Sequence, residues 1–174
     1  MTTERRADVR QESLDMIYTF IRRGIKERAT DIHWEPFEEN HAASIVLRFR
    51  IDGVLKDIER LTDERTNLAS LANAIKIMAN LDPTKKRSEH DGRFTFLHEE
   101  VEYDVRVATM PTILGEKIVM RLMDRKRYCM NLGDLGRSPA SVQTVDAIAF
   151  KPEGFLIISG PTGSGKTTTL YSVI

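Results

Sequence analysis

The chain has 174 residues, of which 41% are hydrophobic and 30% are charged, a balance typical of a folded protein with room for one full domain and part of another. Lys and Arg together number 26, as do Asp and Glu, so the formal net charge of zero gives no electrostatic reason to expect nucleic acid or an anionic membrane as a partner. The one cysteine, Cys129, excludes an internal disulfide, and no stretch approaches the roughly 18 apolar residues of a membrane-spanning helix, so the sequence predicts a cytosolic protein.

An amphipathic helix followed by a strand is predicted near the start of the chain. Apolar residues recur at helical spacing between residues 11 and 28, with charged residues on the other faces. Residues 31–35 then alternate apolar and polar side chains, and Pro36 is expected to end this strand. His33 and Trp34 are interpreted as occupying the two faces of the strand and not as a binding site.

A β-hairpin is predicted next. Residues 45–51 and 54–58 read as two strands, and Asp52 and Gly53 separate them. An Asp-Gly pair is a strong hairpin signal because a type I′ turn needs two positive φ angles.

One more helix and three more strands complete an α+β domain of roughly 120 residues. Asp63 is a plausible N-cap for a helix that ends near Asn80, and the charged segment 82–93 is expected to be an exposed loop. Within that segment, Asp91-Gly-Arg93 is open to two interpretations, a phosphate or subunit contact and a turn that closes a hairpin. The strands are expected at residues 94–97, 102–107 and 117–122.

The rest of the chain has the pattern of an α/β unit. Residues 125–137 contain Arg125-Lys-Arg127 and two glycines and are predicted to be a linker. A helix is expected near residues 138–150, followed by a short buried parallel strand at 155–159 and a helix after Lys166.

Residues 160–167 have the sequence G-P-T-G-S-G-K-T, which fits the phosphate-binding loop pattern G-x-x-x-x-G-K-[ST]. Glycines let consecutive backbone N–H groups curl round an anion, and the start of the following helix adds the positive end of its dipole. Lys166 is the candidate for contacting the β- and γ-phosphates, and the Thr167 hydroxyl is the candidate Mg²⁺ ligand. The expected ligands are therefore a nucleoside triphosphate, ATP or GTP, and Mg²⁺, with binding residues Gly160, Pro161, Thr162, Gly163, Ser164, Gly165, Lys166, Thr167 and Thr168.

A Gly-rich surface turn is the alternative interpretation of this loop. A turn explains neither the Lys166-Thr167 pair nor the strand predicted just before it, so the phosphate loop is favoured.

Several stretches together resemble the type II secretion and type IV pilus assembly ATPases, the general secretion pathway E family. They occur in the family's order and span residues 12–174. The matching stretches are T-D-I-H-W-E-P at 30–36, L-R-F-R-I-D-G-V-L at 47–55, the segment 75–82, K-R-S-E-H-D-G-R at 86–93, D-V-R-V at 104–107, the segment 115–122 and the phosphate loop.

The resemblance implies a fold, an assembly and a location. Residues 10–124 would be a PAS-like N-terminal domain, an antiparallel sheet with helices, and residues 138–174 the beginning of an α/β RecA-like P-loop ATPase domain. The family's members form homohexamers at the cytoplasmic face of the inner membrane, peripheral to it, and work with a membrane platform and with cytoplasmic secretion or pilus proteins. ATP is then the expected nucleotide, and no nucleic-acid partner is expected.

The resemblance also implies roles for two arginines. In the family, arginines of the N-terminal domain reach the phosphates, and by motif position these are Arg106 and Arg121. Both stand in strands that otherwise appear apolar, where a guanidinium needs an anionic partner. The alternative is a structural ion pair with Glu102, Asp104 or Asp124.

The chain departs from the family pattern at His90 and Ser88, and the family's acidic, Walker B and histidine motifs would follow Ile174. Residues 1–174 by themselves are therefore expected to bind nucleotide weakly and not to hydrolyse it. Two functions are alternatives to a secretion or pilus motor: a conjugation-type P-loop ATPase, and a non-catalytic interaction module with a vestigial phosphate loop.

Overall fold

The computed structural model describes residues 3–39, 42–62, 68–124, 131–161 and 164–173. The chain forms two compact units, Met1–Met123 and Asp124–Ile174, called unit 1 and unit 2 below. No described helix is long and apolar enough to cross a membrane.

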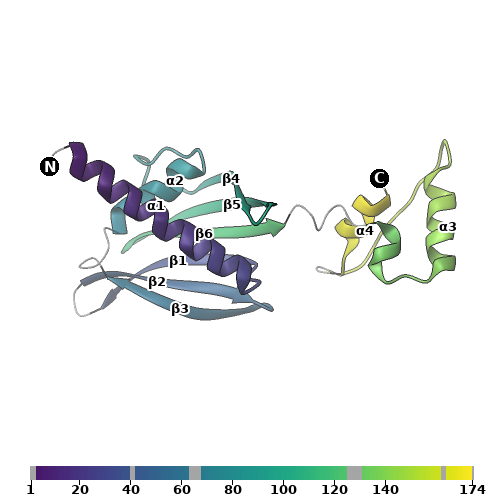
Figure 1. Ribbon diagram of the computed structural model, residues 1–174, viewed down its shortest axis with the longest axis horizontal. Coiled ribbons are helices and arrows are strands. Elements are labelled where there is room, and N and C mark those ends of the chain that lie inside the picture. Colours follow the sequence, from purple (N-terminus) through teal and green to yellow (C-terminus); the bar gives the residue numbers. More distant parts are fainter. Residues whose placement is uncertain (1–2, 40–41, 63–67, 125–130, 162–163, 174) are drawn as a thin grey trace. The chain divides into compact units, whose positions relative to one another are not determined.

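Unit 1 is one six-stranded sheet with two helices (Figure 1). The strand order β3-β2-β1-β6-β5-β4 joins two sequential three-stranded meanders through the first strand of one and the last strand of the other. The pairings β1–β2, β2–β3, β1–β6 and β4–β5 are antiparallel. This confirms the predicted α+β class. The strands are β1 (Asp31–Glu39), β2 (Ala42–Ile51), β3 (Val54–Thr62), β4 (His90–His98), β5 (Val101–Thr112) and β6 (Gly115–Asp124).

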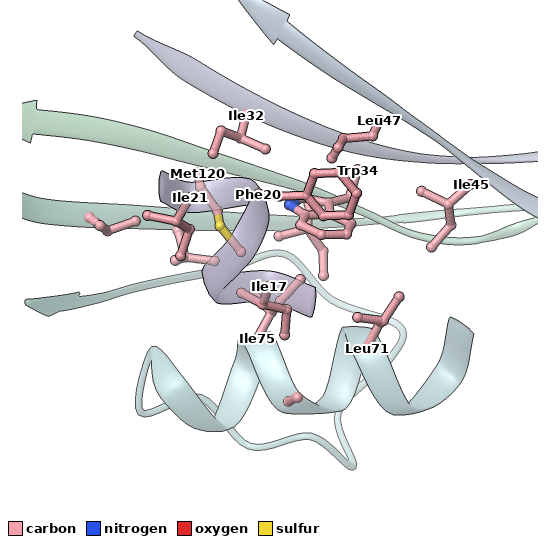
Figure 2. Close-up of a cluster of buried hydrophobic side chains, with 14 of the residues drawn as sticks. Ile17, Phe20, Ile21, Ile32, Trp34, Ile45, Leu47, Leu71, Ile75 and Met120 are labelled. Carbon is pink, nitrogen blue, oxygen red and sulfur yellow. The ribbon is translucent and has the colours of Figure 1, made fainter. Parts of the chain in front are cut away.

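Helices α1 (Thr3–Lys26) and α2 (Leu68–Met78) cover one face of the sheet and bury its apolar residues (Figures 1 and 2). Phe20 of α1 meets the indole of Trp34 edge to face, with ring centroids 5.6 Å apart. Because side chains alternate along a strand, the residues between those of the apolar core lie on the other face, which we call the open face. On β1 the open face carries Asp31, His33 and Glu35.

The predicted type I′ turn is confirmed. Asp52 and Gly53 have φ values of 51° and 81°, and they connect β2 to β3. α1 and α2 are also confirmed, although α1 begins at Thr3, earlier than predicted, and the N-cap expected at Asp63 lies outside the described residues.

Pro36 does not end β1, contrary to expectation. The strand continues to Glu39, with Pro36 opposite Ile45 of β2. β6 pairs with β1 only from Asp31 to Trp34. At Pro36, β1 therefore has only β2 as a pairing neighbour, and a proline, which has no N–H, is tolerated in such a position.

The segment 82–93 is an exposed loop only in its first part, because β4 begins at His90. Asp91, Gly92 and Arg93 are therefore strand residues and not a turn, which corrects one interpretation of this motif. A Cβ at Gly92 would lie 2.4 Å from the carbonyl oxygen of Ala79, so only glycine fits where the end of α2 passes over β4.

Unit 2 contains a short 3₁₀ turn, η2 (Leu132–Leu135), and helices α3 (Pro139–Ala149) and α4 (Lys166–Val173). The predicted helix at 138–150 is confirmed, and Ser138 caps it by accepting a hydrogen bond from the Ser141 amide at 3.2 Å. Arg125-Lys-Arg127 and Cys129 lie outside the described residues.

The strand expected at 155–159 is not formed. Phe155 and Ile157 are 96% and 83% exposed. A parallel strand needs hydrogen-bonded neighbours, and the described residues of unit 2 contain no other strand to provide them.

Candidate functional site

The phosphate loop lies between an extended segment and the first turn of α4. Gly160 and Gly165 have φ values of 155° and 85°, which residues with a Cβ rarely adopt. A Cβ at Gly160 would also lie 2.7 Å from the Ser164 hydroxyl. These two glycines are therefore required by the backbone path, as the motif predicts.

Lys166 closes this loop on itself. Its Nζ donates to the carbonyl oxygens of Gly160 and Pro161, both at 2.7 Å. Lys166 is also the first residue of α4, and the amide of Thr169 donates to the Gly165 carbonyl at 2.9 Å in the first helical turn. The ammonium group is thus held against the backbone that would surround a phosphate.

Two further predicted loop residues, Thr167 and Thr168, lie at the start of α4. Thr167 is exposed and Thr168 is half-buried. Thr162 and Gly163 lie outside the described residues.

The loop's residues fit a nucleotide phosphate and its magnesium ion. The glycines with positive φ, the ammonium of Lys166 and the hydroxyl of the exposed Thr167 are the groups that such a ligand requires. No cluster of three or more His, Cys, Asp or Glu that could hold a metal occurs among the residues the structure describes.

Arg106 and Arg121 lie on the open face of unit 1 and not in its core, which corrects the expectation from their apolar neighbours. Arg106 of β5 is exposed between the buried Val105 and Val107. The side chain of Arg121 in β6 is 66% exposed. Alternation along each strand separates these polar residues from the buried ones.

The structure brings the two arginines to one depression. A hollow of about 590 Å³ on the open face is lined by three arginines, two aspartates and small residues. The lining residues are Asp31, Asp91, Gly92, Arg93, Arg106, Val107, Ala108, Val119 and Arg121.

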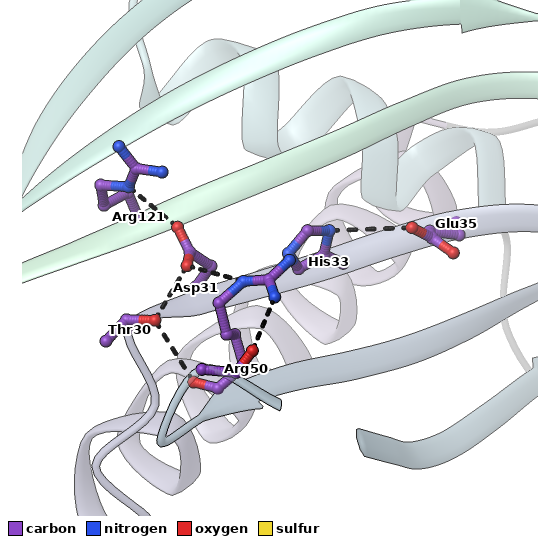
Figure 3. Close-up of polar contacts among 7 residues, drawn as sticks. Thr30, Asp31, His33, Glu35, Arg50 and Arg121 are labelled. Carbon is purple, nitrogen blue, oxygen red and sulfur yellow. Dashed lines mark hydrogen bonds and ion pairs between the residues drawn. The ribbon is translucent and has the colours of Figure 1, made fainter. Parts of the chain in front are cut away.

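Asp31 is the partner of Arg121, and sequence reasoning missed it (Figure 3). Arg121 Nε donates to Asp31 Oδ1 at 2.9 Å, a contact that Figure 3 shows as a dashed line between the two side chains. The other oxygen accepts from Thr30 at 2.8 Å and lies 3.3 Å from Arg50 Nε. Burial alone would raise the pKa of Asp31, but the hydrogen bonds from Arg121 and Thr30 outweigh it and hold that pKa below its ordinary value.

A second ion-pair group continues along the same face. Glu35 accepts from Lys117 Nζ at 2.6 Å and from Arg48 at 2.8 Å, and these cations outweigh burial and lower the pKa of Glu35. His33 sits between Asp31 and Glu35, and burial lowers its pKa despite these two carboxylates. His33 is therefore a neutral strand residue at pH 7, in line with its predicted role.

Lys76 is the other residue that the sequence did not reveal. Its side chain is completely buried, yet Nζ donates to Glu116 at 2.7 Å and to the Lys85 carbonyl at 2.6 Å. This buried pair connects α2 to the start of β6 and to the loop before β4. A lysine inside the apolar stripe of a predicted helix was its only sequence signal.

The sequence matches the family model for Type II/IV secretion system protein over residues 9–174. Among similar curated proteins, type II secretion system protein E of Pseudomonas aeruginosa is 43% identical over 157 residues, or 90% of this chain and 30% of that protein. Type II secretion system ATPase E of Vibrio cholerae is 38% identical over 91% of this chain and 30% of its own length. The chain thus spans about 30% of the length of these relatives.

A solved structure shares the fold. The ATPase DotB of Yersinia pseudotuberculosis matches 90% of this chain and 40% of its own, with a TM-score of 0.54 and 18% sequence identity. This likeness confirms the predicted fold class, an α+β domain followed by the start of a P-loop ATPase domain. With a family model that covers nearly the whole sequence and relatives near 40% identity, the chain belongs to the type II/IV secretion system protein family.

Proposed function

We propose that this chain is the ATP-binding part of a secretion motor ATPase that couples ATP hydrolysis to protein secretion or pilus assembly. The observation that carries the proposal is the phosphate loop, with positive φ values at Gly160 and Gly165 and with the Lys166 ammonium bonded to the carbonyls of Gly160 and Pro161. Family membership adds that similar chains belong to secretion systems, and one is named an ATPase.

In the proposed mechanism, the loop and Lys166 bind the phosphates. Lys166 leaves the carbonyls of Gly160 and Pro161 and donates to the β- and γ-phosphate oxygens, which compete well because they carry full charge. The hydroxyl of Thr167 would hold Mg²⁺, which would neutralise part of the phosphate charge.

Arg106 and Arg121 are proposed to act on the transferred phosphate from unit 1. A guanidinium stabilises the charge that spreads over the phosphoryl oxygens during transfer. Support comes from their shared depression and from the exposure of the Arg121 side chain, which is 66%.

The assembly and location are proposed from the family. A homohexamer, peripheral to the cytoplasmic face of the inner membrane, would work there with a membrane platform and with secretion or pilus proteins. Nucleic acid is not proposed as a partner.

The test is ATP hydrolysis by a full-length form of the protein. Lys166→Ala should lower kcat/KM for ATP by at least about 100-fold, because the phosphates lose a charged donor in both the bound and the transition state. The matched control is Lys151→Ala, which removes an exposed lysine from the same unit and should leave hydrolysis unchanged. Equal activity of the two variants would contradict the proposed role of the loop.

A further inference from the structure

The charges on the open face of unit 1 are distributed unevenly. Near β1 the cations are paired: Arg48 with Asp57 at 2.8 Å, Lys117 with Glu35 at 2.6 Å, and Arg50 with Asp31 at 3.3 Å. On β4 and β5, by contrast, neither Arg93 nor Arg106 has an ion pair or a hydrogen bond from its side chain within the described part of the chain. This half of the face has cations that no acidic group of the described residues neutralises.

Arg93 and Arg106 are directly opposite each other. They are Cα partners in the β4–β5 ladder, and both are exposed. Directly opposite residues of an antiparallel pair have Cβ atoms about 5 Å apart, and like charges at that spacing destabilise the sheet. Asp91 and Asp104 lie two residues away on the same face without neutralising either arginine.

Arg121 completes a group of three. It lines the same depression as Arg93 and Arg106, and its side chain is 66% exposed although its Nε is bonded to Asp31. The carboxylate of Asp31 is itself buried and shared with Arg50 and Thr30. Asp91 is exposed on the edge strand, where solvent screens its charge. An anion in the depression would therefore meet three guanidinium groups.

We propose that Arg93 is a third phosphate-binding residue, which contacts the same phosphate group as Arg106 and Arg121. The proposal rests on the proposed function, in which the latter two bind phosphate. A bound phosphate group would offset the repulsion between Arg93 and Arg106, because a guanidinium group can donate two parallel hydrogen bonds to phosphate oxygens. The phosphate is either the terminal group of ATP or a free anion, since both have the same chemistry.

The first experiment measures anion binding by this chain with Lys166→Ala, so that the phosphate loop does not compete. Magnesium-free tripolyphosphate is titrated while the amide resonances of β4, β5 and β6 are followed by NMR. We expect Arg93→Gln to weaken binding about tenfold, the effect of one charged hydrogen-bond donor. The matched control is Arg22→Gln, an exposed arginine of α1 on the helix side of the sheet, which should not change the affinity.

The two sources of phosphate give different patterns. Binding in the Lys166→Ala chain indicates a free anion. Shifts at Arg93 that need both Lys166 and MgATP indicate the terminal phosphate of the nucleotide. If Arg93→Gln behaves like Arg22→Gln with both ligands, the proposal is wrong.

A stability measurement separates binding from folding. Because Arg93→Gln removes a like-charge contact, the variant should have an unchanged or higher thermal midpoint in the absence of anions. A lower midpoint would show that Arg93 is a structural residue and would overturn the argument.

Hydrolysis by a full-length form distinguishes this proposal from the proposed function. Arg93→Gln should lower kcat/KM for ATP about tenfold or more, and Arg93→Lys should recover part of the loss because the charge returns without the forked geometry. If the Arg106 and Arg121 variants lose activity and Arg93→Gln does not, only the role of Arg93 fails. If none of the three loses activity, the proposed function of this face fails instead.

Discussion

Asp31 is the residue on which the open face of unit 1 depends most. Its side chain is 6% exposed, whereas the side chains of its two arginine partners are 66% and 37% exposed. A buried carboxylate with exposed cations on either side fixes the direction of the cations at a modest desolvation cost. Asp31 therefore orients Arg121 toward the depression.

The lowered pKa of Asp31 makes a prediction about stability and pH. Asp31→Asn should lower the free energy of unfolding of unit 1 by about 1–2 kcal/mol at pH 7, between the values for exposed and buried ion pairs. Because the folded pKa is below the unfolded one, this contribution is present above the ordinary pKa of aspartate and is lost as the pH falls through the folded pKa. Urea unfolding followed by fluorescence of the single tryptophan, Trp34, which is 1% exposed, measures it.

The control for Asp31→Asn is Asp57→Asn, the same substitution at another aspartate of the open face. Asp57 is 55% exposed and pairs with Arg48, so Asp57→Asn should cost less than about 0.5 kcal/mol. If the difference between wild type and Asp31→Asn is the same at pH 7 and at acid pH, the charge of Asp31 does not stabilise the fold.

Part of this network could be predicted from single residues. Alternation along 31–35 places Asp31, His33 and Glu35 on one strand face and Trp34 on the other. Because Trp34 is buried in the apolar core, the face with Asp31, His33 and Glu35 is the open one. That Asp31 faces Arg121, 90 positions away, depends on the β1–β6 pairing, which no local pattern specifies.

At the scale of elements, the crossing of α2 over β4 depends on one glycine. Gly92→Ala should destabilise unit 1 by about 1–3 kcal/mol, because the added methyl meets the backbone carbonyl of Ala79, which cannot rotate away as a side chain can. Gly92 does not have a positive φ in the structure, so the effect would come from space alone. Unfolding in urea, again followed at Trp34, gives the value.

Gly24→Ala is the comparison for this effect. A Cβ at Gly24 would meet the end of the Ile32 side chain at 3.0 Å, which can adjust, and alanine favours the helix. Gly24→Ala is therefore expected to be near neutral or stabilising. If the two alanine variants unfold at the same urea concentration, the close approach of α2 to β4 is not the reason for Gly92.

Most helices and strands could be predicted from the sequence, but which strands pair with one another could not. The type I′ turn at Asp52-Gly53 follows from two residues with a strong local preference. Pro36 was expected to end a strand, but its effect depended on which neighbours β1 has at that point. The apolar run 155–159 has the composition of a parallel strand, yet a strand forms only when others pair with it.

At the scale of the whole molecule, the groups proposed to bind phosphate belong to two different units. Unit 2 contributes the phosphate loop and Lys166, and unit 1 contributes the arginines of the open face. The sequence predicted each half, the loop from its motif and Arg106 and Arg121 from the resemblance. Asp31 became apparent only when the sheet pairing placed it beside Arg121. The Asp91-Gly-Arg93 motif was a candidate phosphate contact from the sequence, but that Arg93 lies opposite Arg106 depends on the pairing of β4 with β5.

Hydrolysis of ATP by a full-length form with Arg106→Gln or Arg121→Gln tests the central claim most directly, with Arg22→Gln as the control on the helix side of the sheet. An arginine that stabilises a transferring phosphoryl group is worth on the order of 10³ in rate or more, so each open-face variant should lose most of its kcat while the control keeps it. Hydrolysis that is unchanged in both variants would contradict the account, because the open face would then bind no phosphate during the reaction.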